Sequence, residues 1–334
     1  MVPFLKLDNS DSYFRSKRRL SAFALVSVLV LVAILSLVSL EFARRSGIHL
    51  KMTVNYAQSV KALYGAHGGY QAALALLMGD KNEYDGAGDM WYGELPPVFL
   101  GEGSVVVSIE DEQARFNLAR LVTEYGLADK RRSAMCSRLF EMLSIDPLLA
   151  DSIVDWEDSD DEALPYGAES AFYSRLDPAY RPRNRQMLTN GELLVMKGFD
   201  RELYFLPPAM RSPAAKEEMG ALLRYITVYG DGRININTAE TSVLACLSSD
   251  MDEFVARDIV EYREEHPFKA VDELKQVKTV SDVLFDEISS LITVRSDMFR
   301  IRSRGMVGEA TREITAVVSR AGGGIRVAYF ERSL

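Results

Sequence analysis

The chain has 334 residues, of which 48% are hydrophobic and 26% are charged, and its formal net charge is -9. This composition is typical of a folded protein with one large or two ordinary cores, so it excludes a wholly disordered chain and a collagen-like repeat. Two cysteines cannot form a disulfide-rich scaffold, and three histidines offer few ligands for a zinc centre.

The charge is distributed unevenly between the N-terminus and the rest of the chain. Residues 1–21 carry five basic side chains and two acidic ones, a net charge of +3, so the remaining residues carry -12. A body this acidic repels phosphate backbones unless it gathers basic residues on one face. We therefore expect no nucleic-acid partner.

Residues 22–40 form an uncharged apolar segment, AFALVSVLVLVAILSLVSL. As a helix it would be roughly 28 Å long, enough to cross the hydrocarbon core of a bilayer once. A cleaved secretory signal is the alternative, but its apolar region is shorter and ends at a small-residue cleavage site, whereas Glu41 and Phe42 follow here. Basic residues before the span favour a cytoplasmic N-terminus. The sequence thus predicts a single-pass membrane protein whose body lies outside the cytoplasm.

Apolar residues continue at helical spacing beyond the span, from Val54 to Leu77. This periodicity predicts that the helix extends as an amphipathic stem to about Met78. Glycine is a poor former of helix interiors, so we expect Gly65, Gly68 and Gly69 to loosen or kink the stem.

Strand-like segments occur at both ends of the remaining chain. Residues 104–109 (SVVVSI) and 225–229 (YITVY) are rich in β-branched and aromatic residues, and Gly230-Asp231-Gly232 predicts a hairpin turn into residues 233–237. Three more runs follow, at 298–303, 311–318 and 325–330. The sequence predicts a sheet assembled from both ends of the body.

Two mostly helical blocks, about 122–222 and 238–293, separate these strands. They share an internal pattern: IVDW at 153–156 resembles IVEY at 259–262, and Glu192-Leu193 resembles Glu273-Leu274. Two related helical units would explain the pattern, and coincidence among common helix residues is the alternative.

The densest chemical feature is DWEDSDDE at 155–162, with six carboxylates in eight residues, followed by Glu169. Such charge repels itself, and a hard cation with oxygen ligands would relieve the repulsion, so calcium is the natural candidate. The candidate ligands are Asp155, Asp158, Asp160, Glu162 and Glu169. Asp158, Asp160 and Glu162 have the spacing of positions 1, 3 and 5 of an EF-hand-like loop, and Glu169 that of position 12. Ala163 and Pro165 depart from that loop, which makes this a noncanonical site, and a solvated acidic loop is the alternative.

Other constellations point away from catalysis and from DNA. Residues 247–277 resemble a helix-hairpin-helix module, but the hairpin at 248–252 has no glycine and two acids, unlike phosphate-binding versions. The chain contains no nucleophile elbow, no P-loop and no dinucleotide fingerprint. Cys136 and Cys246 lie in helical patterns, and whether they form a disulfide is left open.

These segments together resemble the K-type minor pseudopilins of bacterial type II secretion. The resemblance covers nearly the whole chain and rests on phrases that occur in the family's order: IVDW with Asp158, Asp160 and Glu162, then GAE at 167–169, FY at 172–173, RPRN at 181–184, EL at 192–193, KG at 197–198 and RININ-TA at 233–239. The resemblance implies an α+β fold, in which a pilin-like N-terminal transmembrane helix packs on an antiparallel sheet that carries a large helical (SAM-like or helix-hairpin-helix-like) insertion.

The same resemblance implies a structural role rather than an enzyme. Family members start and cap a periplasmic pseudopilus together with I-type and J-type minor pseudopilins, contact the major pseudopilin and the inner-membrane platform, and bind Ca²⁺ in the helical domain. Pseudopilin precursors are cut by prepilin peptidase after a glycine, but the first 46 residues here contain none. The nearest equivalent of that cleavage site is the bond between Ala22 and Phe23.

The resulting organisation has seven parts: a basic leader (1–21), a transmembrane and stem helix (22–78), the first part of the sheet (79–121), a helical insertion with the acidic segment (122–222), a strand and hairpin (223–237), a second helical unit (238–293) and C-terminal strands (294–334). A membrane-anchored calcium-dependent enzyme or binding protein of the cell envelope is the competing functional hypothesis. A nucleophile beside a base would favour it, and the sequence suggests neither.

Overall fold

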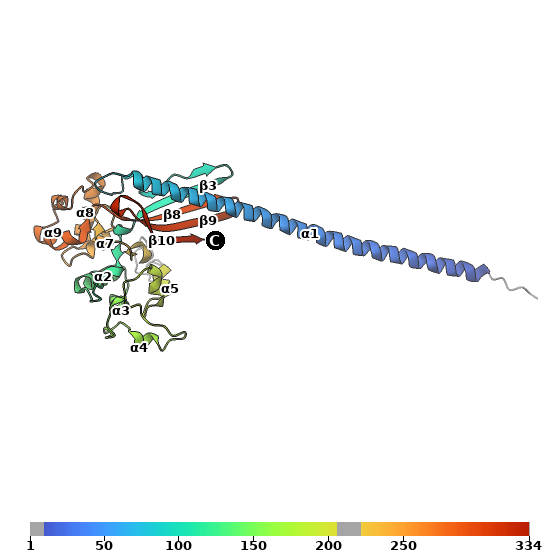
Figure 1. Ribbon diagram of the computed structural model, residues 1–334, viewed down its shortest axis with the longest axis horizontal. Coiled ribbons are helices and arrows are strands. Elements are labelled where there is room, and N and C mark those ends of the chain that lie inside the picture. The colour runs from blue at the N-terminus through green and yellow to red at the C-terminus, as the bar shows by residue number, and fades with distance from the viewer. Residues whose placement is uncertain (1–9, 206–221, 334) are drawn as a thin grey trace, which may run out of the picture.

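The computed structural model describes residues 10–205 and 222–333, and Figure 1 shows a head carried at one end of a long helix. Helix α1 (Ser10–Gly79) is unbroken over 70 residues, about 105 Å at 1.5 Å per residue. It contains an apolar window with a mean hydropathy of 2.9, none of which is buried by the head. The helix is therefore long and apolar enough to cross a membrane. Its final turns pack on the sheet, where Ala66, Tyr70, Ala73 and Leu77 are buried.

The main sheet is antiparallel and comes from both ends of the body. Its strand order is β1-β3-β8-β9-β10, and β2 also pairs with β3. The strands are β1 (Gly93–Glu94), β2 (Val98–Leu100), β3 (Gly103–Asp111), β8 (Met298–Val307), β9 (Ala310–Ser319) and β10 (Arg326–Ser333). This arrangement confirms the predicted α+β class with a helix on an antiparallel sheet.

Side-chain alternation explains which face of the sheet meets α1. On β3, Val105, Val107 and Ile109 are buried, while the residues between them are partly exposed. Phe299 and Ile301 of β8 complete the same core. Since successive strand residues point to opposite faces, one apolar face packs on the stem and the other carries polar residues.

The stem glycines do not break the helix, which corrects the kink predicted from them, and Gly65 and Gly69 allow it to pack closely on the sheet. A Cβ on Gly69 would lie 2.3 Å from Ser303 Oγ and 2.7 Å from a methyl group of Val105. On the other side of this contact, a Cβ on Gly305 would lie 2.0 Å from the carbonyl oxygen of Ala62. Tertiary packing therefore overrides the low helix propensity of glycine.

The helical insertion between β3 and β8 has its own core. The α-helices are α2 (Lys130–Met142), α3 (Leu149–Glu157), α4 (Ser170–Tyr173), α5 (Arg201–Phe205), α7 (Thr241–Ala245), α8 (Glu253–Glu265) and α9 (Asp282–Ile288). The described residues of this region also form six 3-10 turns, at Glu112–Ala114, Leu118–Arg120, Asn190–Val195, Leu222–Arg224, Val271–Gln276 and Ser289–Leu291, and Ala321–Gly323 forms another between β9 and β10. Residues 1–9 of the leader and 206–221 of the insertion lie outside the described residues.

Residues 225–237 do not form the predicted hairpin. Instead, β5 (Ile226–Thr227) pairs in parallel with β4 (Phe116–Asn117), and β6 (Ile234–Asn235) pairs in parallel with β7 (Ile292–Thr293). The side-chain amide of Asn117 donates to the carbonyls of Tyr229 and Gly230, at 2.8 and 3.2 Å. The glycine turn is therefore held by residues far away in sequence, which local turn signals could not reveal.

The internal pattern found in the sequence corresponds to a hydrogen bond that occurs in both helical units. In each helical unit a glutamate accepts a hydrogen bond from the backbone N–H four residues earlier: Leu188 donates to Glu192 at 2.8 Å, and Lys269 donates to Glu273 at 2.7 Å. Both glutamates lie in six-residue 3-10 turns, Asn190–Val195 and Val271–Gln276. The shared geometry supports two related helical units.

Candidate metal centre

Three of the five candidate ligands meet at the end of α3. Asp155 lies in the last turn of α3, Asp158 is its C-terminal cap, and Glu169 precedes α4. One carboxylate oxygen from each lies within 4.8 Å of the others, and all three residues are buried. The intervening loop thus brings carboxylates from two helix ends to one point.

Two of these three carboxylates lack partners that buried acids normally have. Both oxygens of Glu169 and Oδ1 of Asp158 are buried without a hydrogen-bond partner. Burial, followed by repulsion from neighbouring carboxylates, raises the pKa of Asp155 to about 7 and that of Glu169 to about 8. Burial and Asp160 raise the pKa of Asp158 to about 6. Since buried charges require compensation, this cluster needs protons or a cation.

The loop around the cluster is built for close approach. Asp155 accepts hydrogen bonds from the backbone N–H of Leu164 at 3.0 and 3.2 Å. A Cβ on Gly167 would lie 2.0 Å from Oδ2 of Asp155, so only glycine fits beside that carboxylate. The ammonium group of Lys197 donates to the carbonyls of Tyr166 and Gly167, at 3.1 and 2.8 Å, and so anchors the loop without neutralising the acids.

The other two candidates lie away from this cluster. Asp160 and Glu162 are exposed, and Asp160 accepts a hydrogen bond from the backbone N–H of Glu162 at 2.8 Å. The spacing of an EF-hand-like loop therefore does not describe the observed cluster, because Asp155 is supplied by the preceding helix. Gly167 and Lys197 also support the loop. The sequence did not predict these roles, because each depends on a contact with a residue distant in sequence.

A second group of acids provides a useful contrast. Asp80, Asp85 and Asp89 also come within 4.8 Å of one another. Arg320 donates to Asp80 at 2.9 Å and to both oxygens of Asp85 at 2.7 Å, and the indole N–H of Trp91 donates to Asp80 at 3.0 Å. Protein donors already compensate these carboxylates, so this group clamps the end of α1 to the sheet and does not require a cation.

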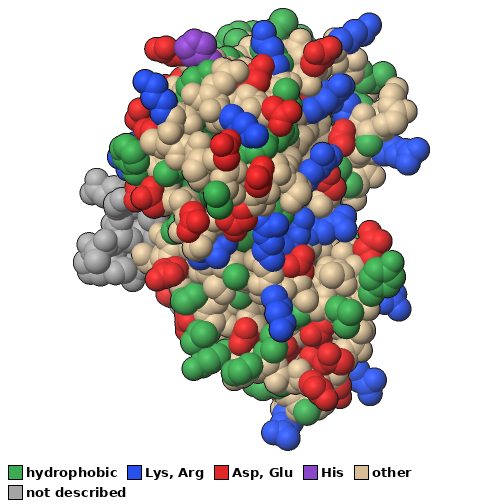
Figure 2. Space-filling view, turned by 90° about the vertical axis from the view of Figure 1, so that its left-hand side faces the viewer, with side chains coloured by type: hydrophobic (Ala, Val, Ile, Leu, Met, Phe, Trp, Pro, Cys, Tyr) green, Lys and Arg blue, Asp and Glu red, His purple; other side chains and the backbone are tan. Residues whose placement is uncertain are grey.

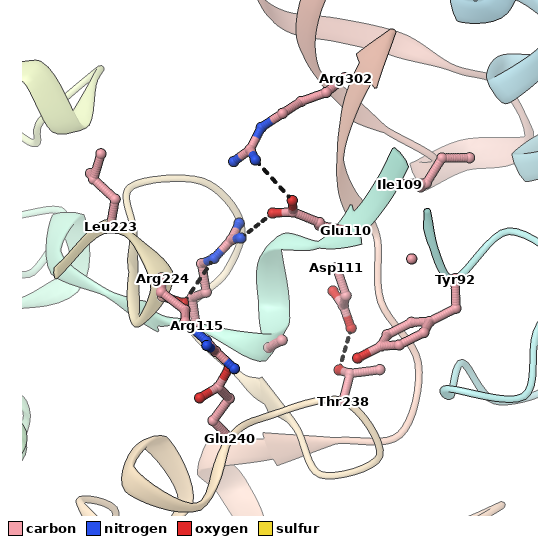
Figure 3. A pocket seen from close by; sticks show the side chains of 12 residues that line it. Tyr92, Ile109, Glu110, Asp111, Arg115, Leu223, Arg224, Thr238, Glu240 and Arg302 are labelled. Atoms are coloured by element: carbon pink, nitrogen blue, oxygen red, sulfur yellow. Dashed lines mark hydrogen bonds and ion pairs between the residues drawn. The ribbon is translucent and has the colours of Figure 1, made fainter. Parts of the chain in front are cut away.

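The pocket in Figure 3, of about 430 Å³, lies where the sheet meets the insertion. Its charged side chains form pairs among themselves: Arg302 and Arg115 both contact Glu110, and Arg224 contacts Glu240. On its inner wall the buried carboxylate of Asp111 accepts a hydrogen bond from Thr238 at 2.6 Å. These interactions join the sheet to the insertion. Because the charged side chains that line the pocket already have partners, none of them requires a small ligand.

The cluster at the end of α3 fits a hard divalent cation. Its donors are all carboxylate oxygens, which suit calcium or magnesium and suit softer transition metals poorly. Three unpartnered buried oxygens are available to such an ion. Asp155, Asp158 and Glu169 would hold it, and its charge would offset their mutual repulsion.

Two further sequence features are placed by the structure. At the hairpin between α7 and α8, Asp252 accepts a hydrogen bond from Val255 N–H at 2.9 Å, and the hydroxyl of Ser248 receives Asp250 N–H at 3.0 Å. Those amides are therefore not available to bind a phosphate.

Cys136 and Cys246 are free, fully buried thiols, and burial raises the pKa of Cys246 to about 12.

Comparison with known proteins supports the resemblance seen in the sequence. A family model for type II secretion system protein K matches residues 114–206, and a helix-hairpin-helix motif matches residues 231–293. The protein K of Pseudomonas aeruginosa is 26% identical over 326 residues, covering 93% of this chain and 92% of the relative. The protein K of Aeromonas hydrophila is 24% identical and covers 91% of this chain and 94% of its own.

A solved structure shows the same fold. The crystal structure of the GspK-GspI-GspJ complex from the type 2 secretion system of enterotoxigenic Escherichia coli contains a chain that matches with a TM-score of 0.65 and 18% identity, over 86% of this chain and 99% of that chain. The shared fold, the protein K segment and the relatives that match along nearly the whole length agree with one another. Together these matches support the identification of the chain as similar to the K-type minor pseudopilins of type II secretion systems along nearly its whole length.

Proposed function

We propose that this protein starts and caps the periplasmic pseudopilus of a type II secretion system, in complex with I-type and J-type minor pseudopilins. The observation that carries the proposal is the large helical insertion, which extends from the distal end of a pilin-like stem and sheet (Figure 1). Relatives that match nearly the whole chain are type II secretion proteins K, which favours this structural role over the envelope-enzyme alternative.

The shape of the head suits one terminal position in a filament. Pilin-like subunits repeat by placing slender stems side by side, and a heterologous contact of this kind leaves one open end on each subunit. The insertion widens the end of the head opposite the stem, so a further subunit stacked beyond it would meet the insertion (Figure 1). A capping subunit needs only one face that binds another subunit, the face that points toward the membrane.

The proposed location follows from the stem. The apolar part of α1 would anchor the chain in the inner membrane, and the basic residues before it would stay in the cytoplasm, leaving the head in the periplasm. Prepilin peptidase, the major pseudopilin and the inner-membrane platform are the further partners that this role requires. The Ala22–Phe23 bond, the candidate processing site, lies within the continuous helix α1.

We also propose that the structural ion of the head is calcium, held by Asp155, Asp158 and Glu169. The unpartnered oxygens of Asp158 and Glu169 and the raised pKa values of all three acids support the site. Calcium accepts six to eight oxygen ligands in flexible geometry, which suits carboxylates contributed by a helix end and a loop. The ion would stabilise the insertion and take no part in a reaction.

Co-purification tests the main proposal. The full-length chain is produced together with the I-type and J-type proteins of the same secretion system, extracted in detergent with calcium, and isolated through a tag on this chain. We expect the two partners in a stable complex and loss of secretion on deletion of the gene. A chain that is isolated alone at micromolar concentration would contradict the tip assignment and favour the envelope-enzyme alternative.

A further inference from the structure

The segment that follows the acidic loop reverses the sign of the local charge. Residues 155–169 contain seven acidic side chains and no basic one, whereas residues 170–190 contain four arginines and one aspartate. Three of these arginines are exposed, and we call them the arginine rim: Arg175, Arg181 and Arg185. In Figure 2 acidic side chains gather on the lower part of the head, and basic side chains project at the outline around them. A chain with a net charge of -9 thus carries a local positive surface.

The arginine rim does not hold the fold together. Within residues 10–205 and 222–333, none of its three side chains forms an ion pair or a hydrogen bond, although seven acids precede them. The fourth arginine differs, because Arg183 donates to the carbonyl of Gln186 at 2.8 Å and lies 3.9 Å from Glu192. The fold therefore accounts for Arg183 and leaves the rim available to another molecule.

The core of the insertion fixes this segment in place. The rings of Tyr173 and Tyr180 lie 5.4 and 6.4 Å from the buried indole of Trp156 and 5.2 Å from each other. Beside them, Phe172 and Leu176 remain 38% and 37% exposed. Arginine next to exposed apolar side chains is typical of protein-binding surfaces, and a surface that is already ordered loses little entropy on binding.

We propose that the arginine rim, with Phe172 and Leu176, binds a carboxylate-rich segment of a partner protein outside the pseudopilus. Guanidinium groups form bidentate pairs with carboxylates, and the two apolar side chains require an apolar residue among those carboxylates. The inference rests on the proposed function. Helix α4 lies on the side of the insertion away from α1 (Figure 1), so a partner bound here leaves the stem free for other subunits.

Position and chemistry argue against a phosphate-bearing surface as the occupant. About 58 Å of helix separates Leu40 from Gly79, and the insertion lies at that far end of α1 (Figure 1), out of reach of the inner membrane. A phosphate site gathers its donors around one point, often at a helix N-terminus. The rim is instead spread along residues 175–185, with Asp177 among its arginines, which suits several carboxylates along a partner segment.

A binding measurement on the full-length protein in detergent tests this chemistry. The probe is a fluorescein-labelled peptide in which glutamate and leucine alternate, and binding is followed by fluorescence anisotropy. We expect micromolar affinity that weakens as salt is added, because the pairs are exposed. The same peptide with lysine in place of glutamate should not bind, and one with serine in place of leucine should bind more weakly.

Charge reversal on the rim has a matched control. Arg175→Glu with Arg181→Glu should weaken binding of the glutamate–leucine peptide about tenfold or more. Arg295→Glu with Arg326→Glu makes the same charge change at two exposed arginines that also lack an ion pair in the described part of the chain. This control should stay within about twofold of the unmodified protein. If the rim variant melts at a lower temperature than the control, Arg175→Gln with Arg181→Gln replaces it.

Secretion by cells that carry each double variant relates the surface to function. The rim variant should lower secretion about tenfold while still co-purifying with the I-type and J-type proteins, and the control variant should secrete normally. Because the I-type and J-type complex is retained, such a loss would place the defect in a contact outside the pseudopilus.

Three results would overturn the inference: equal losses in the two double variants, normal secretion by the rim variant, or no binding of the glutamate–leucine peptide. Tighter binding to phosphatidylglycerol vesicles than to the peptide, or displacement of the peptide by inorganic phosphate, would also overturn it in favour of a phosphate-bearing ligand. If the I-type and J-type proteins still co-purify with the unmodified chain, the proposed function stands. If they do not, the proposed function itself fails.

Discussion

Gly69 of the stem and Ser303 of the central strand β8 approach so closely that a Cβ on the glycine would lie 2.3 Å from the serine hydroxyl oxygen. The same Cβ would come within 2.8 Å of side-chain methyl groups of Val105 and Val107 on β3. Valine side chains have little rotational freedom, so they cannot easily move aside. This contact sets how near the stem lies to the sheet.

Gly69→Ala should therefore destabilise the head, although alanine favours helices. Overpacking costs about 1–3 kcal/mol, whereas the gain in helix propensity is about 1 kcal/mol. Gly68→Ala is the matched control, because nothing lies within 4 Å of its Cβ position, and it should be neutral or stabilising. Thermal unfolding of the detergent-solubilised protein distinguishes them, and equal melting temperatures would show that the sheet can move away.

Calcium should stabilise the protein through the cluster at the end of α3. An ion that binds only the native state at a concentration 100 times its dissociation constant adds about 2.7 kcal/mol, so chelation should lower Tm by about 5 °C. Glu169→Gln should remove this dependence, since Glu169 contributes two unpartnered oxygens. Asp160→Asn, at an exposed residue outside the cluster, should retain it. Identical melting of the unmodified protein in calcium and in chelator would argue against the site.

The stability of the metal-free protein should depend on pH in a direction unusual for acids. The folded-state pKa values of Asp155, Asp158 and Glu169, about 7, 6 and 8, lie above the ordinary carboxyl range near 4, so the native state binds more protons than the unfolded state between those limits. The free energy of unfolding contributed by these groups should thus fall as pH rises from 4 to 8.

Calcium should reverse that trend, because it competes with protons for the same oxygens and binds more tightly as they ionise. Melting temperatures measured in chelator and in calcium across pH 5–8 test both statements. Glu169→Gln without metal should show a weaker pH dependence than the unmodified protein. Parallel curves with and without calcium would contradict the assignment.

The two helical units should respond unequally to loss of the glutamates that the internal sequence pattern aligns. Glu192 accepts hydrogen bonds from Leu188 N–H and from the indole of buried Trp156 at 3.0 Å, so Glu192→Ala should cost about 1–3 kcal/mol by leaving a buried donor unpaired. Glu273→Ala, which removes the similar backbone bond to Lys269, should cost about 1 kcal/mol or less. Chemical denaturation gives the comparison, and equal losses would mean that the indole bond contributes little.

The N-terminus of the membrane-extracted protein should begin at Phe23 if prepilin peptidase accepts the Ala22–Phe23 bond. The basic residues before the span and the absence of glycine in the first 46 residues leave this bond as the nearest match to a processing site. N-terminal sequencing measures it directly, with a peptidase-deficient strain as the control. A mature start beyond Leu40 would show that the span is a discarded signal.

Regular elements could be predicted wherever one periodicity dominates. The apolar span and the stem follow from uninterrupted helical spacing, and Val105, Val107 and Ile109 identify a half-buried strand by alternation alone. The acidic segment also identified the region of the cluster, because so many adjacent carboxylates are costly without compensation. The parallel pairs β4–β5 and β6–β7 could not be predicted, since two-residue strands have no period and their partners lie about 60 to 110 residues away.

The sequence by itself determined the apolar segment long enough to span a membrane, the strands that come from both ends of the body, the helical character of the insertion and the location of surplus negative charge. These are properties of neighbouring residues, and periodicity and composition record them. Only the tertiary structure decided that Asp155, Asp158 and Glu169 meet while Asp160 and Glu162 remain exposed, because loop closure sets which carboxylates lose their water. It likewise decided that Gly65 and Gly69 of the stem are contact points: a glycine weakens an isolated helix, but here the sheet occupies the space that a Cβ would take.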